Sequence, residues 1–231
     1  MSYKGFERLE RMMGENGIRL LNQSRVIIFG LGGVGGSAAE ALARSGIGTL
    51  GLVDGDKVEV TNLNRQIIAL NSTLGISKVD VMKSRVLDIY PEIKVNTYNE
   101  FYSPENAEEF FLEQYDYVID AIDTMTSKIH LIARSEELGV PLVSSMGMGN
   151  KWNPTMLEVD DIYNTSVCPL AKVLRKELKA LGVKGCKVVY SKEISLKLRP
   201  PGSTAFVPPV AGIVLASLVV QDILGGLCYE G

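Results

Sequence analysis

The residues best suited to chemistry are a glycine-rich turn and the acid that follows it. An apolar run over 25–29 leads into four glycines, Gly30, Gly32, Gly33 and Gly35. Glycines let the backbone approach a phosphate, and a helix that begins after them offers free N–H groups and a positive dipole end. Asp54 follows 19 residues after Gly35, the distance at which a carboxylate suits a ribose hydroxyl. The pattern predicts a nucleotide site.

Further polar side chains follow Asp54 and change the expected nucleotide. They are Asp56, Asn62, Arg65, Gln66, Lys78 and Asp123. A triphosphate carries more charge than a dinucleotide, and it needs cations and often a metal ion. Arg65, Lys78 and Asp123 are expected at the carboxyl ends of neighbouring strands, where ligands bind in open α/β sheets. We therefore expect ATP at this site.

Apolar runs of strand and helix length alternate along the chain, which predicts an α/β protein. The expected strands are Val26–Phe29, Leu50–Val53, Lys94–Tyr98, Tyr117–Ala121 and Pro141–Ser145. The expected helices are Gly35–Arg44, Lys78–Tyr90, Pro104–Leu112, Ser127–Leu138, Pro169–Leu181 and Val210–Leu224. This order indicates a Rossmann-like, doubly wound and mainly parallel sheet. We expect one domain over 1–231, with the nucleotide-binding part in 1–150 and a crossover, a basic helix and a C-terminal segment that completes the fold in 151–231.

The glycine turn and the polar residues together resemble the ATP site of the ubiquitin-activating-like superfamily, which includes adenylyltransferases for sulfur carrier proteins. The matching segments are Gly30–Gly36, Asp54–Asp56, Asn62–Gln66, Lys78 and Asp123-Thr124. The resemblance covers nearly the whole chain. Within the superfamily the chain is most similar to the dehydratases of threonylcarbamoyladenosine in tRNA, over 38–48, 61–66, 118–123 and 206–212. The segment Ser191–Ala205 is shorter than its counterpart in those dehydratases.

The resemblance implies a role for each candidate residue. Arg65 and Lys78 would bind the phosphates and stabilise charge at the reacting α-phosphate. Asp123 would hold Mg²⁺ directly or through water. Arg11 would reach the ATP of the other subunit of a homodimer, in the manner of an arginine finger. The four glycines, Asp54, Asp56, Asn62 and Gln66 would contact the nucleotide.

The implied reaction is ATP-dependent cyclisation of threonylcarbamoyladenosine in tRNA through a carboxylate adenylate. One alternative is an adenylyltransferase that activates the C-terminus of a ubiquitin-like sulfur carrier. Relatives of that kind commonly hold zinc with two Cys-x-x-Cys pairs, and this sequence has none. A more remote alternative is an NAD-dependent oxidoreductase or a nucleotide-sensing module, which the residues after Asp54 disfavour.

The positive charge of the chain is concentrated in one segment. The formal net charge is −3, but Lys172–Arg199 contains nine basic and two acidic residues, a local balance of +7 against −10 for the remainder. Such a segment is a candidate phosphate-backbone contact. Within the helix expected at Pro169–Leu181 four basic residues fall on one side, Lys172, Arg175, Lys176 and Lys179. We expect them to bind tRNA.

The remaining patterns bear on location and on helix ends. Three cysteines, Cys168, Cys186 and Cys228, with no signal peptide indicate a cytoplasmic protein. The expected ring closure needs none of these thiols. The apolar run Val210–Val220 is shorter than the roughly 20 residues that a bilayer requires, which favours a buried helix. Ser77 and Asp80 form a capping pattern that puts Lys78 in the first turn of a helix, a position that an adjacent anion would favour.

Overall fold

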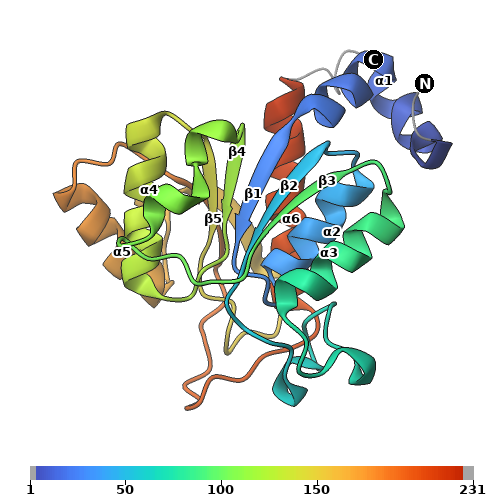
Figure 1. The fold of residues 1–231 in the computed structure, drawn as a ribbon. Coiled ribbons are helices and arrows are strands. Elements are labelled where there is room, and N and C mark those ends of the chain that lie inside the picture. Colours follow the sequence, from blue (N-terminus) through green and yellow to red (C-terminus); the bar gives the residue numbers. More distant parts are fainter. Residues whose placement is uncertain (1–3, 226–231) are drawn as a thin grey trace.

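A seven-stranded sheet organises the protein in a computed structural model that describes residues 4–225 (Figure 1). The strands are β1 Arg25–Phe29, β2 Thr49–Val53, β3 Lys94–Tyr98, β4 Tyr117–Asp120, β5 Leu142–Ser145, β6 Leu157–Asp161 and β7 Lys187–Ser191. Their order is β3-β2-β1-β4-β5-β7-β6, and only β6 is antiparallel to its neighbour. The expected mainly parallel α/β sheet is confirmed.

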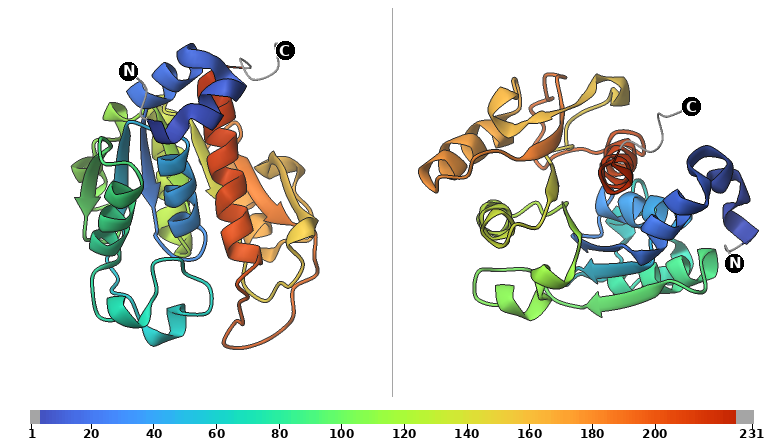
Figure 2. Two further views of the ribbon diagram at one scale, coloured as in Figure 1. Left: turned by 90° about the vertical axis from the view of Figure 1, so that its right-hand side faces the viewer. Right: turned by 90° about the horizontal axis from the view of Figure 1, so that it is seen from above.

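Helices cover both faces of this sheet (Figure 2). They are α1 Glu7–Gln23, α2 Gly35–Arg44, α3 Lys78–Ile89, α4 Met125–Leu138, α5 Pro169–Ala180 and α6 Val207–Leu224. Short 3-10 helices are η1 Lys4–Phe6, η2 Val60–Asn62, η3 Asn71–Thr73, η4 Ala107–Phe110, η5 Leu112–Gln114, η6 Pro154–Met156 and η7 Ile162–Asn164. Successive side chains of β1 point to opposite faces of the sheet. Val26 and Ile28 belong to one apolar cluster, whereas Ile27 and Phe29 belong to another.

The strand order reverses beside β1. The chain runs outward from β1 through β2 to β3, and then returns to place β4 on the other side of β1. Phe29 is in register with Val53 of β2 and with Asp120 of β4. The three strands thus end at one level, and the segments that follow them meet at one edge. This reversal is the place where doubly wound sheets bind ligands.

Helix α6 packs directly on α2 (Figure 2). A Cβ atom on Gly212 would lie 2.1 Å from the backbone oxygen of Val34, so the two backbones touch and only glycine fits. Among the described residues α6 alone is long and apolar enough to span a membrane by length and composition. It is longer than the run Val210–Val220 that the sequence indicated. Its residues Ala211, Leu215 and Val219 are fully buried in the main apolar cluster.

Two sequence expectations about the elements were wrong or incomplete. No α-helix forms over 104–112, where η4 and η5 meet at Phe111 in a left-handed conformation with φ of 46°. The side chain of Asn106 bonds the backbone of Phe101 and Ser103, and such local bonds compete with a helix. The elements named from the sequence above also did not include α1, which is kinked at Gly14, or the strands β6 and β7.

Candidate functional site

The glycine turn lies at the carboxyl end of β1, tightly enclosed by backbone. Gly30 has a φ of +87°, and a Cβ there would lie 2.7 Å from the carbonyl oxygen of Ala121, just after β4. At Gly35, the first residue of α2, a Cβ would lie 1.8 Å from the carbonyl oxygen of Gly30. The α2 N-terminus therefore closes directly onto the strand end, and its free N–H groups are available to a phosphate.

Asp54 connects the end of β2 to this turn. Its Oδ2 accepts the Leu31 N–H at 2.7 Å and its Oδ1 accepts the Asp56 N–H at 2.8 Å. Burial raises the pKa of the Asp54 carboxyl, and Lys78 and the two N–H groups offset this only in part. Each oxygen keeps a lone pair beyond these bonds, which matches the acceptor role expected toward a ribose.

Lys78 is buried between two carboxylates. Its Nζ lies 2.6 Å from Asp56 Oδ2 and 3.7 Å from Asp54 Oδ1. The expected anion beside the first turn of α3 is therefore present within the chain. Ser77 occupies the expected N-cap position of α3, but the expected capping bond is absent, because the Ser77 hydroxyl donates to Asn99 Oδ1 at 3.1 Å.

The segment after Asp54 returns to the glycine turn. The Arg65 carbonyl lies 3.2 Å from a Cβ placed on Gly33, and Gln66 Nε2 lies 3.9 Å from one on Gly32. Arg65 Nη1 donates to the carbonyl of Thr61 and to Asn64 Oδ1. Asn62 is buried, and its Oδ1 accepts the Glu59 N–H at 3.1 Å in a capping box. The Asn62 side chain thus stabilises the fold of this segment.

Gln66 Oε1 is a buried polar atom without a hydrogen-bond partner among the described residues. Burial of an unpaired acceptor is costly, so such an atom calls for a donor from outside the chain. The orphaned oxygen, the enclosed glycine turn and the buried Lys78 fit a bound nucleotide at this edge.

Asp123 stands exposed in the segment after β4, and it forms no hydrogen bond or ion pair within the part of the chain that the structure describes. Residues 4–225 hold no group of three or more His, Cys, Asp or Glu side chains suited to a metal. A single carboxylate that shares Mg²⁺ with substrate phosphates and water is, however, the usual arrangement for this ion. Asp123 fits that arrangement.

A buried ion pair that sequence reasoning missed fixes the segment carrying Asp123. Lys128 Nζ lies 2.6 Å from Asp120 Oδ2, and both side chains are almost fully buried. The ammonium also donates to Ser144 Oγ and to the Ser145 carbonyl, while Asp120 Oδ1 accepts the Ile122 N–H. An acid in the apolar run of β4 and a lysine eight residues later were the available signal.

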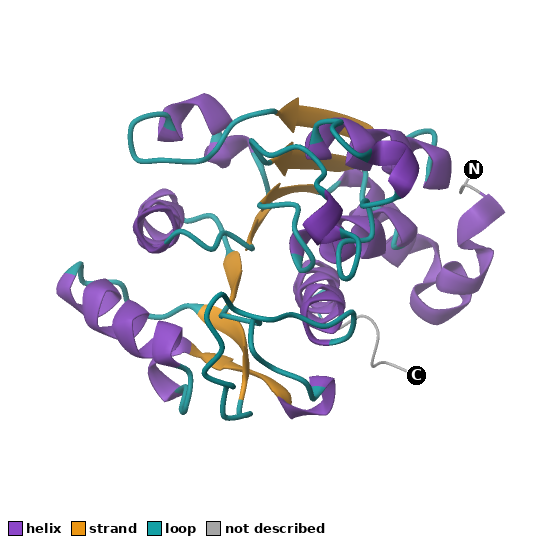
Figure 3. Cartoon of the chain, turned by 90° about the horizontal axis from the view of Figure 1, so that it is seen from below, coloured by secondary structure: helices purple, strands orange, loops and turns teal. Residues whose placement is uncertain are grey.

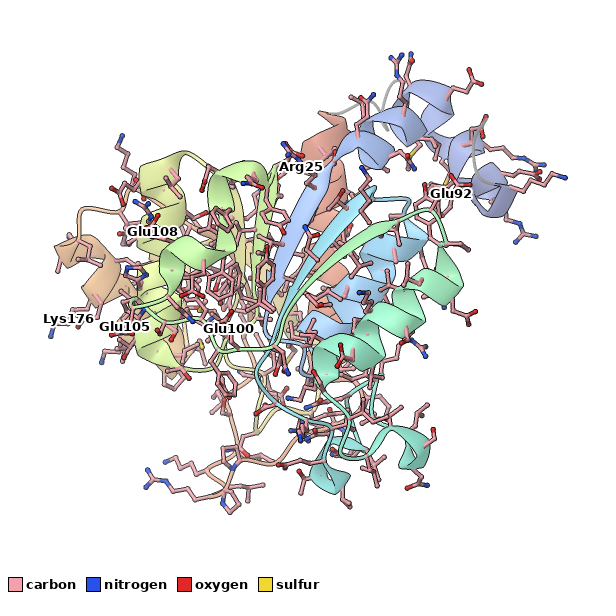
Figure 4. All side chains as sticks on the ribbon, in the orientation of Figure 1. Arg25, Glu92, Glu100, Glu105, Glu108 and Lys176 are labelled. Atoms are coloured by element: carbon pink, nitrogen blue, oxygen red, sulfur yellow. The ribbon has the colours of Figure 1, made fainter. Side chains whose placement is uncertain are left out.

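The basic helix α5 lies at the far side of the molecule from α2 and α3 (Figure 4). Lys172, Lys176 and Lys179 are exposed as expected, and Lys176 is labelled at the molecular edge. Arg175 departs from the expectation, because its half-buried guanidinium donates to the Thr165 carbonyl at 2.8 Å and to the Thr165 hydroxyl. Arg175 therefore packs the helix and leaves three lysines for a ligand.

Arg11 is the candidate that the structure does not bring to the site. It is exposed on α1, which lies at the top of Figure 1, whereas the loops after β1, β2 and β4 lie below the sheet. The described cysteines are both buried; Cys168 precedes α5, and burial raises the pKa of the Cys186 thiol. Cys228 lies outside the described residues.

The fold is that of the doubly wound α/β class, and its switch point carries a site that fits a nucleotide. The model of the ThiF family matches residues 6–227. The chain belongs to the ThiF family.

Two relatives and one solved structure among the similar proteins are described as tRNA threonylcarbamoyladenosine dehydratases. The chain is 45% identical to a tRNA threonylcarbamoyladenosine dehydratase of Bacillus subtilis, over 95% of this chain and 94% of that protein. It is 43% identical to the Escherichia coli dehydratase, over 74% of this chain and 63% of that protein. A crystal structure of the E. coli dehydratase in complex with ATP matches with a TM-score of 0.92 and 36% identity, covering 99% of this chain and 97% of the other.

Proposed function

We propose that this protein is an ATP-dependent tRNA threonylcarbamoyladenosine dehydratase. The observation that carries the proposal is the end-to-end likeness to the B. subtilis dehydratase, which spans 95% of the chain. The likeness includes the edge where the glycine turn, Asp54 and Lys78 meet. A related dehydratase binds ATP within the same fold.

The chemistry is adenylylation followed by ring closure. The threonyl carboxylate attacks the α-phosphate of ATP, which forms an acyl-adenylate and releases pyrophosphate. A nitrogen of the same modification then attacks the activated carbonyl, loses its proton and displaces AMP. The net change is the loss of one water and the formation of a ring. No thiol is required, which agrees with the burial of Cys168 and Cys186.

Each site residue has a part in this proposal. The N–H groups of the glycine turn and of α2 bind phosphate oxygens, and Asp54 accepts a ribose hydroxyl. Lys78 and Arg65 stabilise the charge that develops at the α-phosphate. Arg65 exchanges its bonds to Thr61 and Asn64 for phosphate oxygens. Asp123 would hold Mg²⁺, which neutralises phosphate charge when bound.

The partners follow from the same proposal. The tRNA backbone lies along the exposed lysines of α5. The enzyme acts as a homodimer, because Arg11 on α1 is remote from the ATP site of its own subunit. The protein is cytoplasmic, and α6 serves as a core helix, as its contact with α2 supports.

Activation of a sulfur carrier protein remains the alternative within the same chemistry. The lack of Cys-x-x-Cys pairs in the sequence weighs against it, as does the likeness to dehydratases along nearly the full chain.

Purified protein incubated with ATP and tRNA carrying threonylcarbamoyladenosine tests the proposal, with nucleoside mass spectrometry as the readout. The expected product has lost one water, and AMP appears in equal amount. NAD should not replace ATP, and Lys78→Ala should abolish most of the conversion. Unchanged nucleoside with the active-site residues intact would contradict the proposal.

A further inference from the structure

Two aromatic rings are exposed beside the proposed ATP site. Trp152 exposes 67% of its surface and Phe206 53%, with ring centroids 6.4 Å apart and planes at 76°. Large aromatic side chains usually bury most of their surface. Exposed apolar side chains that lie together often mark an interaction site, whereas single scattered ones do not. We call Trp152 and Phe206 the aromatic pair.

The backbone that presents Trp152 is held firmly. The Trp152 N–H donates to both carboxylate oxygens of Glu193 at 3.0 Å, and the Asn153 N–H donates to Glu193 Oε2 at 2.8 Å. Lys151 is buried, and its Nζ donates to the Glu193 carbonyl at 2.9 Å. The backbone that carries the indole is therefore already ordered, so a ligand that binds there orders little additional backbone.

The aromatic pair borders the phosphate-binding turn. Phe206 ends the segment 192–206, which we call the rim segment. Asn64 Nδ2, next to Arg65, donates to the rim carbonyl of Ser203 at 3.0 Å. Pro208, two residues beyond Phe206, lies 3.0 Å from a Cβ placed on Gly33. Figure 1 shows the loops after β2 and β7 at the same end of the molecule, which is the end that faces the viewer in Figure 3.

The rim segment is basic on its exposed surface. It contains Lys192, Lys197 and Arg199 against one acid, Glu193, whose carboxylate is already bonded to backbone N–H groups. Lys197 and Arg199 are exposed and form no ion pair within residues 4–225. Flat rings with adjacent unpaired cations suit a single-stranded nucleic acid, whose bases stack and whose phosphates attract Lys and Arg.

We propose that the aromatic pair and the rim segment bind the nucleotides that flank the modified adenosine. A neighbouring base stacks on Trp152, and Lys197 and Arg199 contact the backbone phosphates. This inference rests on the proposed function, because the threonyl carboxylate must reach the α-phosphate of ATP. The flanking nucleotides then have to lie against the surface that borders the phosphate turn. The lysines of α5, at the far side of the sheet, contact a different part of the tRNA.

Trp152 is the only tryptophan of the sequence, so its fluorescence reports this contact directly. The probes are an anticodon stem–loop RNA with threonylcarbamoyladenosine and a duplex of the same stem without a loop. The stem–loop should quench the fluorescence in a saturable manner, whereas the duplex should not.

Substitutions give the matching energetic test. Trp152→Ala should weaken stem–loop binding and raise the KM for tRNA by about 10-fold, the usual effect of losing one stacked base. Trp152→Tyr should restore most of the affinity, and ATP binding should not change. The control is Phe111→Ala, which removes an exposed aromatic side chain between η4 and η5, outside the surfaces proposed to bind RNA. The double variant Lys197→Gln/Arg199→Gln should reduce the slope of log Kd against log salt concentration by about 1.4, which corresponds to two lost phosphate contacts on a single strand.

Two outcomes would overturn the inference while the proposed function stands. In the first, wild-type protein cyclises the nucleoside, but Trp152→Ala retains its KM for tRNA and the stem–loop leaves the fluorescence unchanged. In the second, the fluorescence depends on protein concentration without RNA and Trp152→Ala alters the oligomeric state, which would assign the aromatic pair to a contact between two copies. Failure of wild-type cyclisation together with saturable quenching would instead reject the proposed reaction and keep the RNA contact.

Discussion

Lys78 determines the charge balance at the nucleotide edge, since it is buried beside Asp54 and Asp56. We expect Lys78→Ala and Arg65→Ala each to lower kcat by about 10²-fold or more, because cations at the α-phosphate act mainly in the transition state. The Kd for ATP should rise much less. Rapid-quench measurement of AMP formation and equilibrium ATP binding separate the two effects. Lys57→Ala, an exposed lysine of the same segment, is the control. Equal changes in kcat and in affinity would assign these cations to ground-state binding.

Lys128 is the residue whose removal should most damage stability. Lys128→Met leaves the Asp120 carboxylate buried without its cation, which typically costs about 3–5 kcal/mol. Urea unfolding measures this, and Lys176→Met, at an exposed lysine of α5, should change little. Lys128→Met combined with Asp120→Leu should recover part of the loss, because no unpaired charge remains. A single Lys128→Met variant as stable as wild type would show that the pair is not needed to hold the segment after β4.

Residue types and spacing predicted the nucleotide edge but not how its groups are paired. Asp54 and Lys78 lie close to each other at the carboxyl edge as expected, because Asp54 directly follows β2 and Lys78 begins the helix to which the chain after β2 leads. The Lys128–Asp120 pair was missed because a lysine near the start of a helix is normally exposed to solvent. Its burial becomes evident only from the positions of β4 and β5 in the structure. The engagement of Arg175 by Thr165 likewise depends on how α5 packs against η7.

Helix α5 presents an apolar side to the core and three lysines to solvent, with Leu174 and Leu178 fully buried. Reversal of Lys172, Lys176 and Lys179 to Glu should weaken tRNA binding. It should also reduce the slope of log Kd against log salt concentration by about 3, because each phosphate contact releases counterions. ATP binding should be unaffected. Filter binding over a salt series measures the slope. Unchanged affinity in the triple variant would leave α5 with a structural role only.

Helices α2 and α3 are joined by Glu40, which forms ion pairs with Arg85 of α3 and Arg44 of α2. Burial alone would raise the pKa of Glu40, but the hydrogen bonds and charges of the two arginines bring it below its usual 4.5. A lowered carboxyl pKa contributes stability that is present above 4.5 and is lost as the pH falls through the folded-state value.

The free energy of unfolding of the wild type should therefore exceed that of Glu40→Gln by about 1 kcal/mol near neutral pH. This is the range measured for partly exposed ion pairs. The difference should shrink below pH 4.5. Urea midpoints over a pH series test this. Glu92→Gln is the control, because Glu92 is exposed at the molecular edge (Figure 4) and has no ion pair within residues 4–225. A difference that stays constant with pH would mean that the charge of Glu40 is not responsible.

Elements with strong apolar periodicity were predictable, and those defined by local side-chain bonds were not. The five expected strands and the helices α2, α3, α4, α5 and α6 are present within a few residues. The helix expected over 104–112 was wrong. The Asn106 side chain accepts the Ser103 N–H, and Phe110 packs in the core against Phe29. Apolar content alone does not distinguish that arrangement from a helix.

At the scale of the molecule, α1, which carries Arg11, and the proposed ATP site lie at opposite ends of the sheet. If Arg11 acts on the partner's ATP, a mixture of inactive Arg11→Ala and inactive Lys78→Ala subunits should recover activity. Random mixing places both intact groups in one site of each hybrid dimer, so about one quarter of sites should be complete, which follows from the two-fold symmetry of a dimer. Turnover by the mixture and light scattering measure this. A monomer, or a dimer that recovers nothing, would contradict action in trans.

The strand β6 pairs only with β7, and β7 joins the remaining sheet through a short parallel contact with β5. The five strands from β3 to β5 form a continuous ladder that does not depend on this unit for its own pairing. If the β5–β7 seam opened together with the contacts of α5 with α4 and of β7 with α6, β6, α5 and β7 would separate while the ladder of β1, β2 and β4 kept its amides protected. We therefore expect two cooperative units of different stability, and the lysines of α5 belong to the one whose only strand pairing with the five-stranded ladder is that of β7 with β5.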